Sequence, residues 1–302
     1  MSVVSVEHLT KDYGMGRGVF DVNFSIEKGE VFGFLGPNGA GKSTTIRHLM
    51  GFSKPDSGYT KINDKDTFKY HYQILDNVGY LPGEIALPEG LTGTQFINMM
   101  KKLRHMKDDK LTNELINMFE LDPSGETKSM SLGQKRKLAV VVAFMNDPDI
   151  LILDEPTSGL DPVMQEVFIE YVKKEKERGK TILLSSHIFS EVDATCDRIA
   201  IIKDGKIVDN FITSELKHNK IKVYKVNFEN KLDINKIQSG HQFEVVDIKG
   251  NEVTFNVNEN STNEFIAELS NFKIKDIIED KISLQDYFMK FYKEDRIYGE
   301  VE

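Results

Sequence analysis

Two segments near the amino terminus alternate hydrophobic and polar residues. Residues 3–9 and 19–26 follow the two-residue period of strands that are buried on one face. A continuous apolar run follows at 31–35, as expected for a strand that is covered on both faces. A helix is predicted next, over about 42–50, because Gly51 follows the last residue of the pattern and suits a helix end.

Helical periodicity dominates the middle of the chain. Apolar residues recur at helical spacing from 94 to about 119 and again from 131 to 145, which predicts a helical insertion. Short apolar runs return at 150–154 and 181–185, and a helix is predicted between them at about 163–178. This order of strand, helix and strand predicts a parallel sheet.

The pattern changes after about residue 210. Residues 221–228, 242–248 and 252–257 alternate like strands, and 262–270 and 283–292 have helical spacing, so a small α+β domain is expected. One face of the last helix is apolar and carries Leu284, Tyr287, Phe288 and Phe291. This face either packs on the strands of its own domain, which is the default, or meets a second subunit.

Composition narrows the classes of protein. The 302 residues can form one or two cores, and 39% hydrophobic with 29% charged residues is typical of a soluble globular chain. The net charge of −9 disfavours broad attraction to nucleic acid or an anionic membrane. Cys196 is the only cysteine, which excludes an intramolecular disulfide and fits a reducing compartment.

No segment has the pattern of a signal peptide or a transmembrane helix. The amino terminus lacks a basic segment followed by an apolar run. The longest apolar runs, such as 138–145, are far shorter than the roughly 20 residues that a membrane-spanning helix needs. We therefore expect a cytoplasmic chain whose role at a membrane depends on a partner.

A glycine-rich loop joins the strand at 31–35 to the next helix. Its residues Gly36, Gly41, Lys42 and Ser43 fit G-x-x-x-x-G-K-[ST]. Such a loop lets backbone N–H groups approach phosphate oxygens at a helix start, where a lysine adds a cation for the β and γ phosphates. The Ser43 hydroxyl is suited to Mg²⁺, so ATP with Mg²⁺ is the predicted ligand, and an ordinary turn is the alternative.

Two acids follow the apolar run at 150–153. Asp154 is predicted to support Mg²⁺, and Glu155 is predicted to polarise the attacking water. The alternative is a strand that ends in a solvated acidic turn. His187 follows the strand at 181–185 and is a candidate to bond the γ-phosphate or the water, or else is an ordinary surface residue.

Tyr13 precedes the phosphate loop in the chain. An aromatic ring at this place can stack on adenine, whereas the alternative is packing against neighbouring strands.

Together these motifs resemble one family, the ATPase subunits of ATP-binding cassette (ABC) transporters, over about residues 2–210. In order, they are the aromatic Tyr13, GPNGAGKST at 36–44, MSLGQ at 130–134, ILILDEP at 150–156, SGLD at 158–161 and SSH at 185–187. MSLGQ is similar to the LSGGQ signature, which other phosphate-loop ATPases lack. The fold that the resemblance implies is α/β: a phosphate-loop ATPase core with an antiparallel β subdomain and a helical insertion at about 84–145.

The resemblance also implies a dimer in which two subunits pack head to tail around two ATP molecules. Ser131, Gly133 and Gln134 of one subunit would then face the γ-phosphate held by the other, with Asp161 at the contact between subunits. Ser131 also suits a helix N-cap, and both roles are compatible. The loop residues expected at the nucleotide are Gly36, Asn38, Gly39, Ala40, Gly41, Lys42, Ser43 and Thr44.

Two positions depart from the family pattern. Leu132 replaces a glycine of the signature, which requires its side chain to point away from the nucleotide. Gly83 stands where the family usually has glutamine, so it offers no side chain to Mg²⁺ or water. Either Glu84 substitutes from the next position or the metal holds an extra water molecule.

The resemblance implies a separate polytopic transmembrane subunit. Its short cytoplasmic helices would dock on the helical insertion, and the loop at 79–84 would transmit closure to it. SSH, the LTG at 91–93 and the tail resemble ATPases of bacterial exporters for drugs, antibiotics and antimicrobial peptides. We expect an ATPase domain at 1–214 and an accessory domain at 215–302, held at the cytoplasmic face of the membrane by the partner.

Other classes remain as alternatives. A soluble ABC ATPase that acts on ribosomes or DNA is disfavoured by the single cassette, the absence of a long heptad repeat and the acidic charge. A scaffold that binds nucleotide without hydrolysis is disfavoured by the presence of Glu155 and His187. The second ATPase subunit is either an identical chain or a sister chain.

Overall fold

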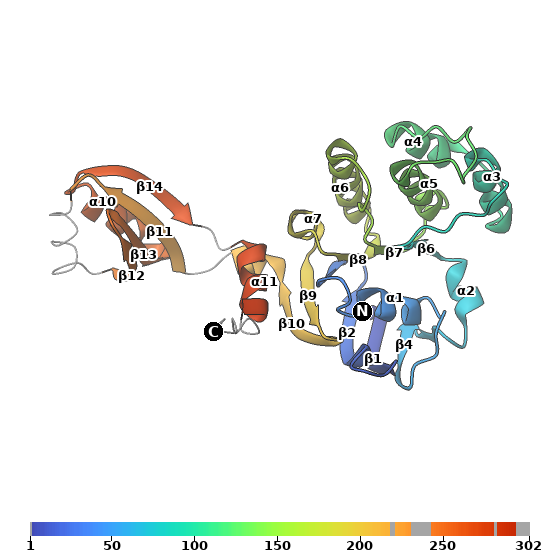
Figure 1. Ribbon diagram of the computed structural model, residues 1–302, viewed down its shortest axis with the longest axis horizontal. Helices are drawn as coiled ribbons and strands as arrows, with labels where there is room; N and C mark the ends of the chain where they lie inside the picture. Colours follow the sequence, from blue (N-terminus) through green and yellow to red (C-terminus); the bar gives the residue numbers. More distant parts are fainter. Residues whose placement is uncertain (1, 218–220, 231–242, 281–282, 294–302) are drawn as a thin grey trace, which may run out of the picture. The chain divides into compact units, whose positions relative to one another are not determined.

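The computed structural model describes residues 2–217, 221–230, 243–280 and 283–293. The chain divides into two compact units, Met1–Ile212 and Thr213–Glu302 (Figure 1). The division falls two residues before the boundary that the sequence predicts.

An antiparallel sheet opens the first unit. Its strands are β1 (Ser2–Asp12), β2 (Gly18–Glu27), β4 (Ser57–Ile62) and β5 (Lys65–Asp66), in the order β2-β1-β4-β5. The first two strands include the two predicted from alternation, at 3–9 and 19–26. The pattern did not predict β4, which is stabilised by pairing with β1 rather than by a clear period of its own.

A six-stranded sheet forms the centre of the first unit, in the order β10-β9-β3-β8-β7-β6. Its strands are β3 (Val31–Leu35), β6 (Val78–Leu81), β7 (Ile150–Asp154), β8 (Thr181–Ser186), β9 (Arg198–Lys203) and β10 (Lys206–Ile212). All neighbours pair in parallel except β9 with β10. Every residue of β3, β7 and β8 is buried, which accounts for their continuous apolar runs.

Side chains from both sheets share one core. The ring of Phe24 in β2 stacks on Phe32 with centroids 5.1 Å apart and lies 5.4 Å from Phe34. Ile46 and Leu49 of helix α1 (Lys42–Leu49) are buried in the same cluster. The core therefore fixes the base of the loop that joins β3 to α1.

A helical insertion lies between β6 and β7. It contains α3 (Gly93–Leu103), α4 (Lys110–Met118) and α5 (Leu132–Phe144), which Figure 1 shows grouped together. The periodic stretch at 94–119 is interrupted at His105, whose φ of 51° cannot continue a helix. The remaining helices of this unit are α2 (His71–Leu75), α6 (Pro162–Glu177) and α7 (Phe189–Thr195).

The second unit has its own antiparallel sheet, in the order β12-β13-β11-β14. Its elements are α8 (Thr213–Lys217), β11 (Ile221–Phe228), β12 (Glu244–Lys249), β13 (Glu252–Asn258), the 3-10 turn η1 (Glu259–Ser261), α10 (Thr262–Leu269), β14 (Ile274–Asp280) and α11 (Leu284–Lys293). Phe265 of α10 packs on Tyr224, Phe243 and Phe255, with ring centroids 5.1–5.2 Å apart. Residue 242, at the start of one predicted strand, lies outside the described residues.

One strand of this unit was missed by the sequence pattern. β14 reads IKDIIED, which has no regular alternation, and it forms as an edge strand by pairing with β11. In the described part of the chain, no helix has the length and hydropathy needed to span a membrane.

Candidate functional site

The loop between β3 and α1 has the geometry of an anion site. Gly41 caps α1 with a φ of 111° and no side-chain hydrogen bond, so the first N–H groups of the helix have no internal acceptor. A Cβ on Gly41 would lie 2.9 Å from Val19 Cγ1, so this position requires glycine for space as well as for conformation. Asn38 and Gly39 are exposed, whereas Gly36 and Ala40 are buried.

Lys42 begins α1 and is only 5% exposed. Its Nζ donates to the carbonyl oxygens of Gly36 at 2.6 Å and Pro37 at 3.2 Å, which curls the side chain back over the loop. The same Nζ lies 3.0 Å from Oε1 of Glu155. The cation predicted for the phosphates and the acid predicted for the water therefore lie together.

Asp154 ends β7, and its carboxylate is held from one side. Ser185 Oγ at the end of β8 donates a hydrogen bond to Oδ1 of Asp154. On the other side, a Cβ built on Gly83 would lie 3.0 Å from Oδ2. Ser43 is exposed, and no described residue bonds its hydroxyl. The Ser43 hydroxyl and the Asp154 carboxylate therefore both fit the preference of Mg²⁺ for oxygen ligands.

Glu155 lies between two basic groups. Its φ of 49° places it in the left-handed region, at the turn that follows β7. Oε1 faces Lys42, and Oε2 lies 2.5 Å from Nδ1 of His187. The carboxylate is largely buried, whereas the His187 ring is half-exposed.

A further acid, in addition to Asp154 and Glu155, is buried close to His187. Glu191 in α7 is 1% exposed, and its Oε2 accepts a hydrogen bond of 2.6 Å from Ser186 Oγ. Burial raises the pKa of Glu191 to about 7, and the nearby charge of Glu155 adds to the increase. Ser186 Oγ in turn accepts from the N–H of Ile188, so this chain of bonds fixes the backbone on both sides of the histidine.

The signature segment opens α5. Ser131 caps the helix, and its side chain and that of Gln134 each bond the backbone N–H of the other at 3.2 Å. The space for a Cβ on Gly133 is limited by the carbonyl oxygen of Gly159, 3.0 Å away. Leu132 lies beside Gly159, because a Cβ there would be 2.8 Å from Leu132 Cγ.

Two other predicted residues have local partners. Asp161 caps α6, and its Oδ1 accepts the N–H of Met164 at 3.0 Å. Tyr13 lies in the turn between β1 and β2, is 56% exposed and has Lys11 Nζ 5.8 Å from its ring centre. The following turn ends at Gly18, whose carbonyl oxygen would be 3.4 Å from a Cβ on Gly41.

Glu84 is not brought to the acidic pair. Its side chain is exposed and makes no ion pair or hydrogen bond with any described residue, while its neighbour Gly83 faces Asp154.

Sequence reasoning missed two residues that do contact the site. Ser185 binds Asp154, and Arg136, in the polar first half of α5, bonds the loops that flank the site. The residue pattern offered no signal for Arg136, because Lys135 and Lys137 stand beside it in the polar first half of α5.

The fold and this arrangement define a phosphate-loop ATPase. Residues 19–158 match the model of the ABC transporter family. The chain is 37% identical over 213 residues to the uncharacterized ABC transporter ATP-binding protein YhcH of Bacillus subtilis (strain 168), covering 69% of each protein. It is 35% identical over 221 residues to the bacitracin transport ATP-binding protein BcrA of Bacillus licheniformis, covering 72% of each. The chain therefore belongs to the ATP-binding proteins of ABC transporters.

Solved structures agree with this assignment. A structure of the ATP-binding subunit of an ABC transporter has a TM-score of 0.66 and 28% identity, covering 72% of this chain and 92% of the other. The cassette MJ0796, in a dimeric post-hydrolysis state bound to ADP and Pi, has a TM-score of 0.64 and 25% identity, covering 70% and 98%. The expectation of an ATP-hydrolysing ABC subunit is confirmed, and a role on ribosomes or DNA is not favoured.

Proposed function

We propose that this ATPase powers the export of an antibiotic or another antimicrobial compound through a separate transmembrane subunit. Support comes from the relatives, which include the bacitracin transport protein and, at 37% identity over 211 residues, the linearmycin resistance ATP-binding protein LnrL of Bacillus subtilis (strain 168), covering 68% of each protein. For the energy source, the observation that carries the proposal is the position of Glu155 between Lys42 and His187.

In the proposed mechanism, the free N–H groups at the start of α1 and Nζ of Lys42 bind the β and γ phosphates. Ser43 and Asp154 would hold Mg²⁺, which would supply positive charge against the phosphates. Phosphate oxygens compete with Glu155 for Lys42, so nucleotide binding frees the carboxylate to orient water and accept its proton. His187 holds Oε2 of Glu155 and thereby fixes the direction of the carboxylate.

A second ATPase subunit completes each site in this proposal. Ser131, Gly133 and Gln134 of one subunit donate to the γ-phosphate held by the other, while Asp161 lies at the contact between subunits. The capping box of α5 fixes Ser131 and Gln134 for this task, because it holds the first turn rigid. Tyr13 is sufficiently exposed to stack on adenine.

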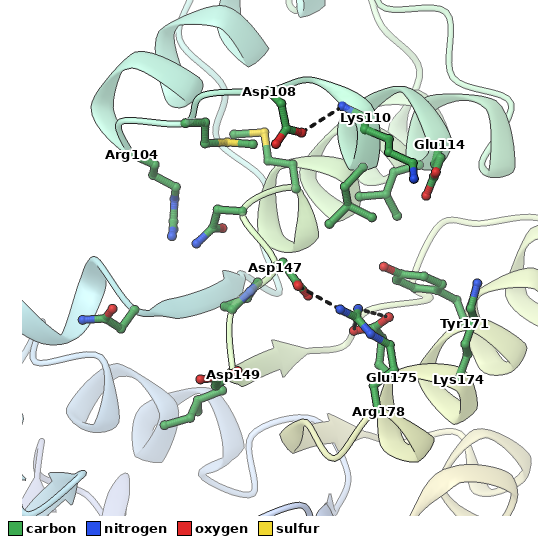
Figure 2. Close-up of a pocket in the computed structure, with 18 of the residues that line it drawn as sticks. Arg104, Asp108, Lys110, Glu114, Asp147, Asp149, Tyr171, Lys174, Glu175 and Arg178 are labelled. Atoms are coloured by element: carbon green, nitrogen blue, oxygen red, sulfur yellow. Dashed lines mark hydrogen bonds and ion pairs between the residues drawn. The ribbon is translucent and has the colours of Figure 1, made fainter.

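The transmembrane subunit would dock in a groove between the helical insertion and the core. This groove has a volume of about 880 Å³. Figure 2 shows Arg104, Lys110 and Glu114 on one side, with Asp147 and Arg178 on the other. Both signs of charge line its walls, and apolar side chains of α4, among them Leu111 and Leu115, add to the lining, which suits a short amphipathic helix with polar ends.

Charge pairs keep one wall of the groove in place. Arg178 donates to Asp147 at 2.8 Å and to both oxygens of Glu175 at 2.8 Å. Arg104 reaches the carbonyl oxygen of Val78, the first residue of β6. A helix seated in the groove would therefore press on the strand that leads to Gly83 and the hydrolysis site.

Affinity isolation from detergent-solubilised membranes, followed by mass spectrometry, tests the partner. We expect one stoichiometric polytopic protein with the wild-type chain and with the control K28E/K206E, which changes exposed lysines outside the groove. The variant K107E/K110E reverses two charges of the groove and should lose the partner. Equal recovery with both double variants would contradict the docking site.

Drug sensitivity of cells tests the transported class. Cells that express the chain with its copurified partner should tolerate a peptide antibiotic better than cells with the E155Q variant. Equal sensitivity across a panel of antibiotics and antimicrobial peptides would remove the proposed substrate class, while the ATPase assignment would stand.

A further inference from the structure

Arg136 joins three segments of the first unit. It lies in α5, is 2% exposed, and uses every nitrogen of its guanidinium as a donor. Nε donates to the carbonyl oxygen of Ser158 at 2.9 Å, Nη1 to that of Pro82 at 2.9 Å, and Nη2 to that of Gly83 at 2.6 Å. A planar group with fixed donor directions can hold two backbone segments at once.

Both segments flank the hydrolysis site. Gly83 packs against Oδ2 of Asp154, and Ser158 lies three residues after Glu155, to whose carbonyl oxygen its N–H donates at 3.1 Å. Arg136 touches neither carboxylate, although both lie close enough to act on its charge. Its direct partners are backbone carbonyls of the two loops that position Asp154 and Glu155.

The same face of α5 makes a second contact with the loop after β7. Leu132 lies one helical turn before Arg136 and packs beside Gly159, and Gly133 approaches the carbonyl oxygen of Gly159. The start of α5 is therefore fastened to this loop by packing and by a hydrogen bond. The loop after β6 is joined to the same helix through Arg136.

We propose that Arg136 is a positioning residue that locks the loops after β6 and β7 to the signature helix. Gly83 has no side chain to direct toward the metal or water, so the position of its loop against Asp154 is set through its carbonyl oxygen. A shift of this loop then moves the signature and the turn after Glu155 together. The arrangement links the hydrolysis site of one subunit to the signature that the same subunit presents to its partner.

Lysine and glutamine cannot replace this geometry. A lysine keeps the charge but has one nitrogen, which cannot reach Ser158 and the Pro82–Gly83 segment in fixed directions. A glutamine is shorter and neutral. Arg198 provides a control, because it is partly buried and likewise uses its guanidinium for several bonds, donating to both oxygens of Glu30 and to the carbonyl oxygen of Ser25, remote from the acidic pair.

Full-length R136K, R136Q and R198K test the proposal at a temperature at which all three are folded by circular dichroism. We expect kcat for ATP to fall about tenfold or more in both Arg136 variants, with KM and the affinity for a fluorescent ATP analogue changed less than about threefold. R198K should keep kcat within about twofold of wild type, even where its melting temperature falls.

Hydrogen exchange gives a readout that needs no turnover. R136K should raise amide exchange at 83–84 and at 157–160 together and leave the phosphate loop unchanged, whereas R198K should leave all three segments unchanged. The proposal is overturned if R136K and R136Q keep wild-type kcat, or if R198K loses kcat to the same extent. It is also overturned if the two loops keep wild-type exchange in R136K, which remains a valid test should R136Q fail to fold.

Discussion

The Nζ atom of Lys42 lies 3.0 Å from Oε1 of Glu155, so the cation of the phosphate loop faces the acid at the end of β7. The lysine is buried and also bonds two carbonyl oxygens of its own loop. Charges that are this close and shielded from water neutralise one another. In the proposed mechanism, binding of phosphate would therefore change the environment of Glu155 directly and couple ATP binding to its action as base.

Replacing Glu155 with glutamine should separate binding from hydrolysis. The amide keeps the shape of the carboxylate but cannot accept a proton, so we expect phosphate release to fall by on the order of a hundredfold or more, while ATP still binds. ATP should then trap a dimer that size-exclusion chromatography detects. The exposed E177Q serves as the control and should turn over like wild type. Continued turnover by E155Q would refute the role of Glu155 as base.

Replacing Gly83 with alanine should disturb Asp154. The new Cβ would stand 3.0 Å from Oδ2, and Asp154 cannot swing away freely because Ser185 holds Oδ1. We expect the Mg²⁺ concentration for half-maximal hydrolysis to rise several-fold, with little change in stability. G125A adds the same methyl group in open space and should leave the Mg²⁺ dependence unchanged. An unchanged Mg²⁺ dependence in G83A would show that Asp154 does not hold the metal in the way we propose.

The sequence predicted those strands whose own residues show a recognisable hydrophobic pattern. β3, β7 and β8 are buried throughout, so their sequences are continuous apolar runs that can be recognised without knowing their neighbours. β14 has no such signal, because it is an edge strand with Ile277 and Ile278 exposed, and only its pairing with β11 makes it a strand. The predictions failed where long-range pairing decides the structure.

The site divides in the same way. The phosphate loop and the acids at 154–155 could be predicted from short motifs, because binding phosphate and a metal requires particular residue types at fixed spacing. The partners of Arg136 are backbone carbonyls from two loops distant in sequence. Every residue has a backbone carbonyl, so residue types alone do not reveal these contacts. Glu84 was considered as a substitute for the missing glutamine only because it is the next residue in the sequence. In the structure, Gly83 and not Glu84 lies beside Asp154.

Glu191 should make stability depend on pH. Its pKa is raised from an ordinary value near 4.5 to about 7 in the folded chain, chiefly by burial and also by the charge of Glu155, against the opposing effects of hydrogen bonds with Ser186 and Thr157 and of the charge of Arg136. Below the ordinary value the group is protonated in both states. As pH rises toward the folded value, the unfolded chain releases its proton first, so stability falls, by on the order of 3 kcal/mol over the whole window.

The variant E191Q removes this titration. We expect the melting temperature of E191Q, relative to wild type, to increase between pH 5.5 and 8, because the glutamine carries no charge to bury. Thermal unfolding at several pH values measures this difference. The exposed E264Q should show no such trend. A relative melting temperature for E191Q that stays flat with pH would mean that Glu191 has the same pKa in both states.

Deleting residues 216–302 should weaken self-association without unfolding the ATPase unit. The described core cluster that joins β1, β2, β3 and α1 is built from residues up to Ile207, so the truncated chain retains it. The deleted part carries the apolar edge positions Ile277 and Ile278, and an exposed edge strand favours pairing with another chain. Sedimentation with ATP in the E155Q background, where the dimer is trapped, should then show a dissociation constant raised several-fold. Unchanged sedimentation would mean that the second unit takes no part in the dimer and that its apolar helix face serves only its own packing.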